Sequence, residues 1–166
     1  MRRAIPVLLV LVLASCASLG SLAQAIQAPR FDVASGFQPQ LRLLGPSTAH
    51  PLGGASIRLW AHVDNPNPVG IVLSALSGSL ALEGTRAADV SFPLGLPLPA
   101  ADDTVIPLDI AVSFADLPGL ANVVQRAFTQ GTVDYQLRGT VAVDAGLLGT
   151  PTFGPMSLLS GSIRTR

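Results

Sequence analysis

The sequence predicts a mainly β fold, a small antiparallel β-sandwich of about seven strands with one packed α-helix. Short runs of alternating apolar and polar residues recur from Phe31 onward, separated by Gly, Pro, Asn and Asp, which is typical of antiparallel strands. One later segment instead repeats its apolar residues at the helical spacing of three and four. With 166 residues, the chain is long enough for one domain with a substantial core.

The expected strands follow one another with turn-forming residues between them. Residues 31–44 predict a broken first strand, and residues 57–63 predict a second strand whose apolar side chains share one face. The proline-containing residues 90–98 fit an edge strand, because proline cannot donate to the sheet ladder. The remaining predicted strands cover 71–83, 106–114, 132–144 and 153–163.

The single predicted helix lies late in the chain. Asp116 is a candidate N-cap, Pro118 fits the first turn, and Gly131 is well placed to end the helix. Its apolar face consists of Leu117, Leu120, Val123, Val124, Ala127 and Phe128.

The first 15 residues have the pattern of an export signal. Arg2 and Arg3 precede an apolar run at residues 5–14, and this run is shorter than the roughly 20 residues that span a bilayer. The run leads into Leu13-Ala14-Ser15-Cys16, which resembles the bacterial lipobox. The resemblance implies cleavage before Cys16 and acyl chains on that residue that anchor the protein in a membrane.

An ordinary signal peptidase site at Ser18, Ala23 or Ala25 is the alternative to lipidation of Cys16. With lipidation, the chain divides into a signal peptide (1–15), a lipidated tether (16–30) and a folded domain (31–166). Because Ala17 is not an acidic retention signal, we expect the outer membrane, facing the periplasm, in a Gram-negative cell. In a Gram-positive cell we expect the outer face of the cytoplasmic membrane.

Charge and cysteine content exclude several function classes. Ten arginines balance ten acidic residues, lysine is absent, and aromatic residues are few, so the sequence predicts no nucleic-acid binding. Cys16 is the only cysteine, which rules out an intrachain disulfide or a cysteine-based metal site.

Patterns that carry catalysis or bind metals are missing from the sequence. The two histidines, His50 and His62, stand without a Gly-x-Ser-x-Gly nucleophile elbow. His62 and Asp64 share one face of a predicted strand, but two ligands are too few for a metal site. We therefore predict a non-enzymatic protein with no catalytic residues, no metal and no cofactor.

Residues 59–68 read Leu-Trp-Ala-His-Val-Asp-Asn-Pro-Asn-Pro and lead into a spaced aliphatic strand that ends at Gly84. This pattern resembles the type 2 late embryogenesis abundant domain, also called the WHy domain for water stress and hypersensitive response. The likeness covers residues 31–166 and implies a sandwich similar to immunoglobulin and fibronectin type III modules. We interpret Asn65, Pro66, Asn67, Pro68 and Gly84 as a structural motif that ends a strand and forms turns.

The resemblance implies protection of stress-labile proteins or membrane surfaces during drying or other water stress. A second hypothesis is a binding module for a lipid or other hydrophobic ligand, held in a seam between sheet and helix. A third is an envelope assembly or docking factor that offers strand edges to a partner. The seam candidates, which the simpler interpretation places in the core, are Ile110, Val112, Phe114, Leu120, Val124 and Phe128.

Overall fold

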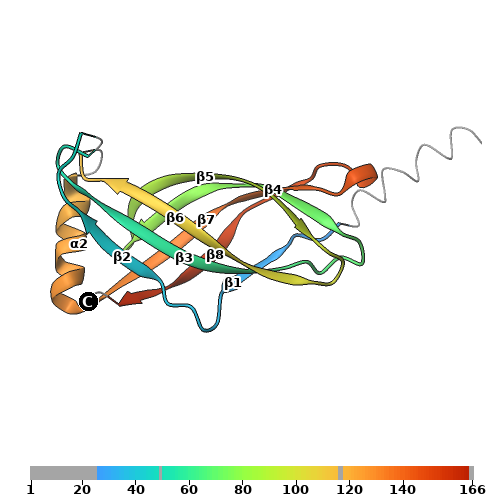
Figure 1. Cartoon of the computed structure of the whole chain (residues 1–166), viewed down its shortest axis with the longest axis horizontal. Coiled ribbons are helices and arrows are strands. Elements are labelled where there is room, and N and C mark those ends of the chain that lie inside the picture. The colour runs from blue at the N-terminus through green and yellow to red at the C-terminus, as the bar shows by residue number, and fades with distance from the viewer. Residues whose placement is uncertain (1–25, 49, 116–117, 165–166) are drawn as a thin grey trace, which may run out of the picture.

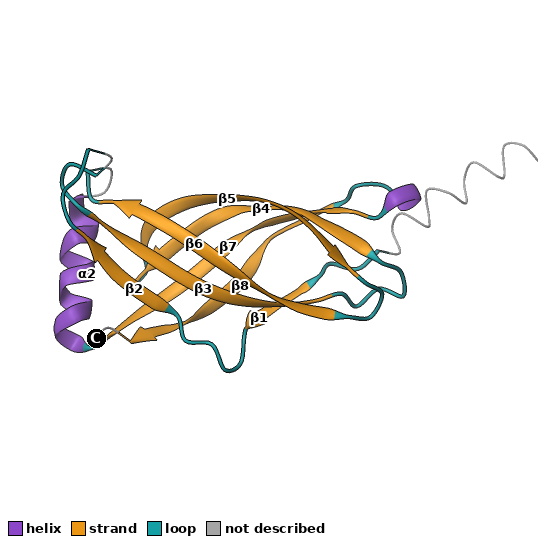
Figure 2. Cartoon of the chain, in the orientation of Figure 1, coloured by secondary structure: helices purple, strands orange, loops and turns teal. Residues whose placement is uncertain are grey.

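The computed structural model describes residues 26–48, 50–115 and 118–164. In this part of the chain, eight strands form two four-stranded antiparallel sheets that face each other as a sandwich (Figures 1 and 2). The predicted fold class is confirmed. The strands are β1 (Arg30–Val33), β2 (Gln40–Leu44), β3 (Gly54–Asp64), β4 (Ile71–Leu82), β5 (Thr85–Leu98), β6 (Asp103–Ser113), β7 (Thr132–Asp144) and β8 (Thr152–Arg164).

The first sheet is built around β3. Strand β6 pairs along the whole length of β3 on one side, from Gly54 opposite Ser113 to Asp64 opposite Asp103. On its other side, β3 pairs with β1 at one end and with β2 at the other. The predicted broken first strand is therefore two strands that share one neighbour, which explains eight strands where about seven are predicted.

The second sheet has the order β5-β4-β7-β8. Strand β5 lies at its edge, as the prolines predict, and Pro93 and Pro97 are both exposed there. The strand begins at Thr85 rather than at Val90, because the turn at Glu83 and Gly84 leads directly into pairing with β4. The prediction of an edge strand is confirmed, but it placed the first residue of this strand too late in the chain.

The hydrophobic core lies between the two sheets. The alternation predicted for β3 is confirmed, since Ile57, Leu59 and Val63 are fully buried while Arg58 is exposed. Each fully buried side chain of this size stabilises the fold by about 1.5–3 kcal/mol relative to an exposed position. The other strands contribute to this core mainly Leu73, Leu76, Leu80, Leu82, Leu108, Ile110, Val133, Leu137, Val141 and Ile163.

Helix α2 (Pro118–Gln130) closes one end of the sandwich, and the 3-10 turn η1 (Gly146–Leu148) lies at the other end (Figure 1). The predicted helix and its end are confirmed, with Gly131 in the left-handed region at φ +81°. Leu120 and Val123 are buried side chains on the inner face of α2. The candidate N-cap Asp116 and Leu117 lie outside the described residues.

In the described part of the chain, no helix has the length and apolar character needed to cross a membrane.

Candidate functional site

The Asn-Pro-Asn-Pro motif forms a buried hydrogen-bonded hub at the end of β3. Asn65 and Asn67 are both fully buried. The Asn65 Nδ2 atom donates to three backbone carbonyl oxygens, those of Val69 at 3.0 Å, Leu98 at 3.3 Å and Pro99 at 2.8 Å. One side chain therefore connects the turn before β4 to the end of β5.

The second asparagine extends this hub to the N-terminal segment. Asn67 donates from Nδ2 to the Asn65 Oδ1 atom at 2.9 Å. It also receives the backbone N–H of Gln27 on Oδ1 at 2.7 Å and donates to the Gln27 carbonyl at 3.0 Å. The Asn67 amide thus offers Gln27 the same donor and acceptor pair as a neighbouring strand would.

This contact joins the last residues of the predicted tether to the domain. Ile26 and Pro29, within residues 16–30 that the sequence predicts as the lipidated tether, are buried. Residues 26–29 are thus part of the folded unit. Cys16 and the rest of the tether lie outside the described residues.

The motif residues do not form a single site. Pro66 is half-buried and Pro68 is exposed beside the asparagine hub. Gly84 lies at the far end of β4, in the turn to β5. There Glu83 accepts the backbone N–H of Asp134 on Oε1 at 2.7 Å. The geometry agrees with a structural role for the motif, with its parts serving two opposite ends of the sandwich.

The six predicted seam residues lie mainly in the core. Ile110, Val112 and Leu120 are 3%, 2% and 1% exposed, which leaves little of their surface for a ligand. Phe114 and Phe128 are half-buried and pack against the same core. The side chain of Val124 lies outside the described residues.

A hollow of about 560 Å³ lies where the edge strands β5 and β6 approach each other. Val112 is the one seam candidate among its lining residues, and Ser113 lies beside it. At its β5 side Arg86 forms an exposed ion pair with Asp89, whose hydrogen bond raises the pKa of the Arg86 guanidinium. The lining of the hollow therefore combines an exposed ion pair with small side chains and Val112.

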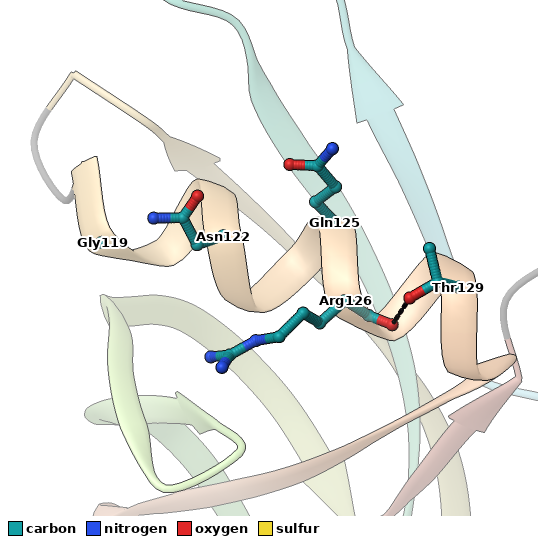
Figure 3. Close-up of a pocket in the computed structure, with 5 residues that line it drawn as sticks. All are labelled: Gly119, Asn122, Gln125, Arg126 and Thr129. Carbon is teal, nitrogen blue, oxygen red and sulfur yellow. Dashed lines mark hydrogen bonds between the residues drawn. The ribbon is translucent and has the colours of Figure 1, made fainter.

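A second hollow, of about 620 Å³, follows the exposed face of α2 (Figure 3). Its lining residues are Gly119, Asn122, Gln125, Arg126 and Thr129. Thr129 donates from Oγ1 to the Arg126 carbonyl at 2.7 Å, and the Arg126 guanidinium extends away from the helix (Figure 3). This polar, open surface does not have the apolar walls of a lipid-binding cavity.

Cross-strand contacts account for the candidates His62 and Asp64 on β3. His62 Nε2 lies 2.7 Å from Asp103 Oδ2, while Asp64 lies 3.7 Å from Arg30. His62 and Asp64 therefore take different partners and do not act as a joint metal site. Among the described residues, no cluster of three or more His, Cys, Asp or Glu side chains could hold a metal ion.

Comparison with known proteins identifies the family. The family model described as "Late embryogenesis abundant protein" matches residues 61–158. The chain belongs to the type 2 late embryogenesis abundant family. The match includes the asparagine hub, Gly84 and the strands from the end of β3 to β8. No curated protein matches the chain in sequence.

Two solved structures share the fold of this chain. A protein from Arabidopsis thaliana is 20% identical with a TM-score of 0.60, and the match covers 85% of this chain and 84% of that one. A late embryogenesis abundant protein solved in solution is 21% identical with a TM-score of 0.52, covering 92% of this chain and 84% of the other.

Gln27, which precedes the residues that the family model matches, makes a contact that sequence reasoning missed. Its backbone attaches the N-terminal segment to the domain, although its partner Asn67 is 40 positions away in the chain. Its backbone makes both bonds, so no side-chain motif marks it. The two asparagines were the available signal, since buried amides need several partners.

Proposed function

We propose that this late embryogenesis abundant protein is a non-enzymatic lipoprotein, anchored through Cys16, that protects envelope components during desiccation or other water stress. The observation that carries the proposal is the order of its parts. A lipobox-like Leu13-Ala14-Ser15-Cys16 stands shortly before a domain of this family. In a Gram-negative cell, we place the protein on the outer membrane, facing the periplasm.

The attachment of Gln27 supports a short connection between lipid and domain. Only residues 17–25 separate Cys16 from the packed Ile26. Nine residues span at most about 30 Å when fully extended. A domain held this close to a membrane has a high effective concentration there, which suits a protector of that membrane and its proteins.

The described surface supports weak contact with many clients. Its exposed large apolar side chains are scattered over different strands and loops. Scattered single residues allow transient contacts with partly dehydrated proteins without the large apolar patch that marks one dedicated partner. These side chains are Val33, Phe37, Leu43, Leu52, Val69, Val105 and Leu147.

The anchor is tested by expressing the full chain and its Cys16→Ser variant in a bacterium that processes lipoproteins. We expect the parent protein to incorporate labelled fatty acid and to sediment with membranes, and the variant to do neither. Cleavage at Ser18, Ala23 or Ala25 in both proteins, with no fatty acid on either, would contradict lipidation.

Protection is tested by drying and rehydrating a labile enzyme on vesicles that carry the purified full-length lipoprotein. The control carries an equal mass of an unrelated lipidated β-sandwich protein. We expect more enzyme activity and less vesicle leakage with the lipoprotein. Equal survival in the two samples would overturn the protective function and leave the anchor untouched.

A second candidate function is binding of a hydrophobic ligand, favoured by the hollow between β5 and β6 where Val112 is found. Mass spectrometry of an organic extract from the purified protein tests it. A stoichiometric lipid beyond the chains on Cys16 would support ligand binding, and an extract that holds only those chains would contradict it.

A further inference from the structure

Leu147 is fully exposed in the turn η1, and this turn lies at the end of the domain opposite α2 (Figure 1). Gly146 and Gly149 flank Leu147 and Leu148, and both glycines have left-handed backbone angles, with φ +61° and +96°. Such angles strain other residues. The loop therefore presents a leucine on a turn that glycine shapes.

Hydrogen bonds within this loop hold the leucine outward. The backbone N–H of Gly146 donates to the Asp144 carboxylate at 2.8 Å. The N–H groups of Leu148 and Gly149 donate to the Ala145 and Gly146 carbonyls at 3.2 and 3.0 Å. A turn with these donors satisfied can enter an apolar environment at lower cost than an open loop.

An apolar surface continues from this turn. A hollow of about 430 Å³ lies where the start of β4 meets the ends of β5 and β7. Val69 directly precedes the lining residue Gly70 in the chain, and Val69 is 39% exposed. The lining is mostly apolar and consists of Gly70, Ile71, Val72, Pro97, Leu98, Pro99, Asp144, Ala145 and Gly146.

The N-terminal segment reaches the domain at this same end. Gln27 is bound to Asn67, and Asn65 beside it donates to the carbonyls of Val69 and Pro99. Ile26, ten residues after Cys16 in the chain, therefore lies at this end. A lipid on Cys16 brings a bilayer within about 30 Å of it.

Acidic side chains predominate near this end, where Asp64, Asp102, Asp103 and Asp144 outnumber Arg30. Arg30 lies 3.7 Å from Asp64, and His62 lies 2.7 Å from Asp103. The Asp102 carboxylate accepts the backbone N–H of Asp103 at 2.9 Å. With no cluster of cations among these residues, the surface fits zwitterionic lipid head groups better than anionic ones.

We propose that Leu147, together with Val69, inserts into the interface of the zwitterionic bilayer that holds the Cys16 lipid, so that the domain stands on this end with α2 pointing away from the membrane. The inference rests on the proposed lipid anchor. It adds an orientation and a second membrane contact, which a lipid anchor alone does not provide. A single leucine adds little affinity, but it sets orientation once the anchor holds the protein at the surface.

The test uses the full-length lipidated protein in phosphatidylcholine vesicles, with an environment-sensitive fluorophore on one introduced cysteine. A thioether on Cys16 leaves the introduced thiol as the only labelling site. Leu147→Cys reports the proposed contact, and Leu52→Cys, an exposed leucine in the loop at the α2 end, is the matched control. Two further proteins carry the fluorophore at Thr150→Cys, one with Leu147 intact and one with Leu147→Asp.

We expect blue-shifted emission and quenching by quencher-bearing lipids at position 147 but not at position 52. At position 150 we expect the same signal with Leu147 intact, lost in Leu147→Asp. Proteins that float with the vesicles yet show water-like emission at all three positions would overturn the insertion and leave the anchor standing. Failure to float, with fluorophore found on Cys16, would overturn the anchor and the insertion together.

Discussion

Gly78 on β4 and Gly139 on β7 lie directly opposite each other, and neither position has room for a Cβ atom. A Cβ on Gly78 would come 2.1 Å from the Arg138 carbonyl oxygen, and one on Gly139 would come 2.2 Å from that of Ser77. Each would also lie 2.8 Å from the other glycine's Cα atom. The centre of the second sheet therefore depends on a backbone approach that only glycine permits.

Substitution of either glycine by alanine should destabilise the fold. Because backbone atoms have to move, we expect Gly78→Ala to lower the free energy of unfolding by at least about 1–3 kcal/mol. Urea unfolding followed by circular dichroism measures this change. Gly45→Ala is the control, since its added Cβ meets nothing within 4 Å. Equal midpoints for the two variants would contradict the close approach.

Asn65→Ala should destabilise the domain by about 1–3 kcal/mol, because it removes the donor to the buried Leu98 carbonyl and to the part-buried Pro99 carbonyl. Thermal and urea unfolding measure the loss. Asn122→Ala, on the exposed face of α2, is the matched control, and we expect it to unfold like the parent protein. A loss of the same size in both variants would argue against the hub.

Asn67→Ala should release the N-terminal segment from the domain. Its side chain provides both bonds to Gln27, so we expect hydrogen exchange of the Gln27 amide to become fast and cleavage by proteases to occur near residues 26–29. Amides in the centre of β3 should keep their protection. Unchanged exchange at Gln27 would show that packing of Ile26, and not Asn67, holds the segment.

Stability should fall at alkaline pH through Tyr135. Burial raises the pKa of this phenol above its usual value near 10, so the folded state keeps its proton to higher pH than the unfolded state does. The free energy of unfolding is fully present below about pH 10 and decreases as the pH rises through the folded pKa. Since Tyr135 is the only tyrosine, phenolate absorbance reports it alone.

The control for this titration is Tyr135→Phe, which keeps the ring and removes the ionisable group. We expect its unfolding free energy to vary less with pH above about 10. The same alkaline loss in the parent and the variant would assign the effect to other groups.

Phe37 should shield Trp60 from water. The two rings stack with centroids 4.6 Å apart and planes 29° apart, on the face of β3 away from the core. We expect Phe37→Ala to shift the fluorescence of this single tryptophan to the red and to cost about 0.5–1.5 kcal/mol of stability. Phe37→Leu, which keeps an apolar cover, should shift it less. Identical spectra for all three proteins would contradict the stacking.

Much of the fold followed from local patterns. The alternation around Leu59 and Leu108 predicted buried strand faces, and both side chains are fully buried. Prolines placed β5 at an edge, and Gly131 marked the end of α2. These predictions succeed because periodicity and backbone chemistry act within a few residues of the chain.

The boundaries of the strands and the surroundings of the candidate site residues were harder to predict from the sequence. The first strand region divides into β1 and β2 because β3 is long enough to pair with both. The seam residues Ile110 and Leu120 carry the same apolar pattern whether they line a groove or a core. In the structure their side chains are only 3% and 1% exposed. This burial depends on how the two sheets and α2 pack together.

By itself, the sequence determined the fold class, the family pattern around Asn65 and Asn67, and which side of most strands is buried. Only the tertiary structure decided that Asn67 holds Gln27, that Gly78 meets Gly139, and that Leu147 shares one end of the domain with Gln27. Periodicity records which face of an element avoids water. It does not record the distant partner, because hydrogen bonds and close approaches form only when segments far apart in the chain meet.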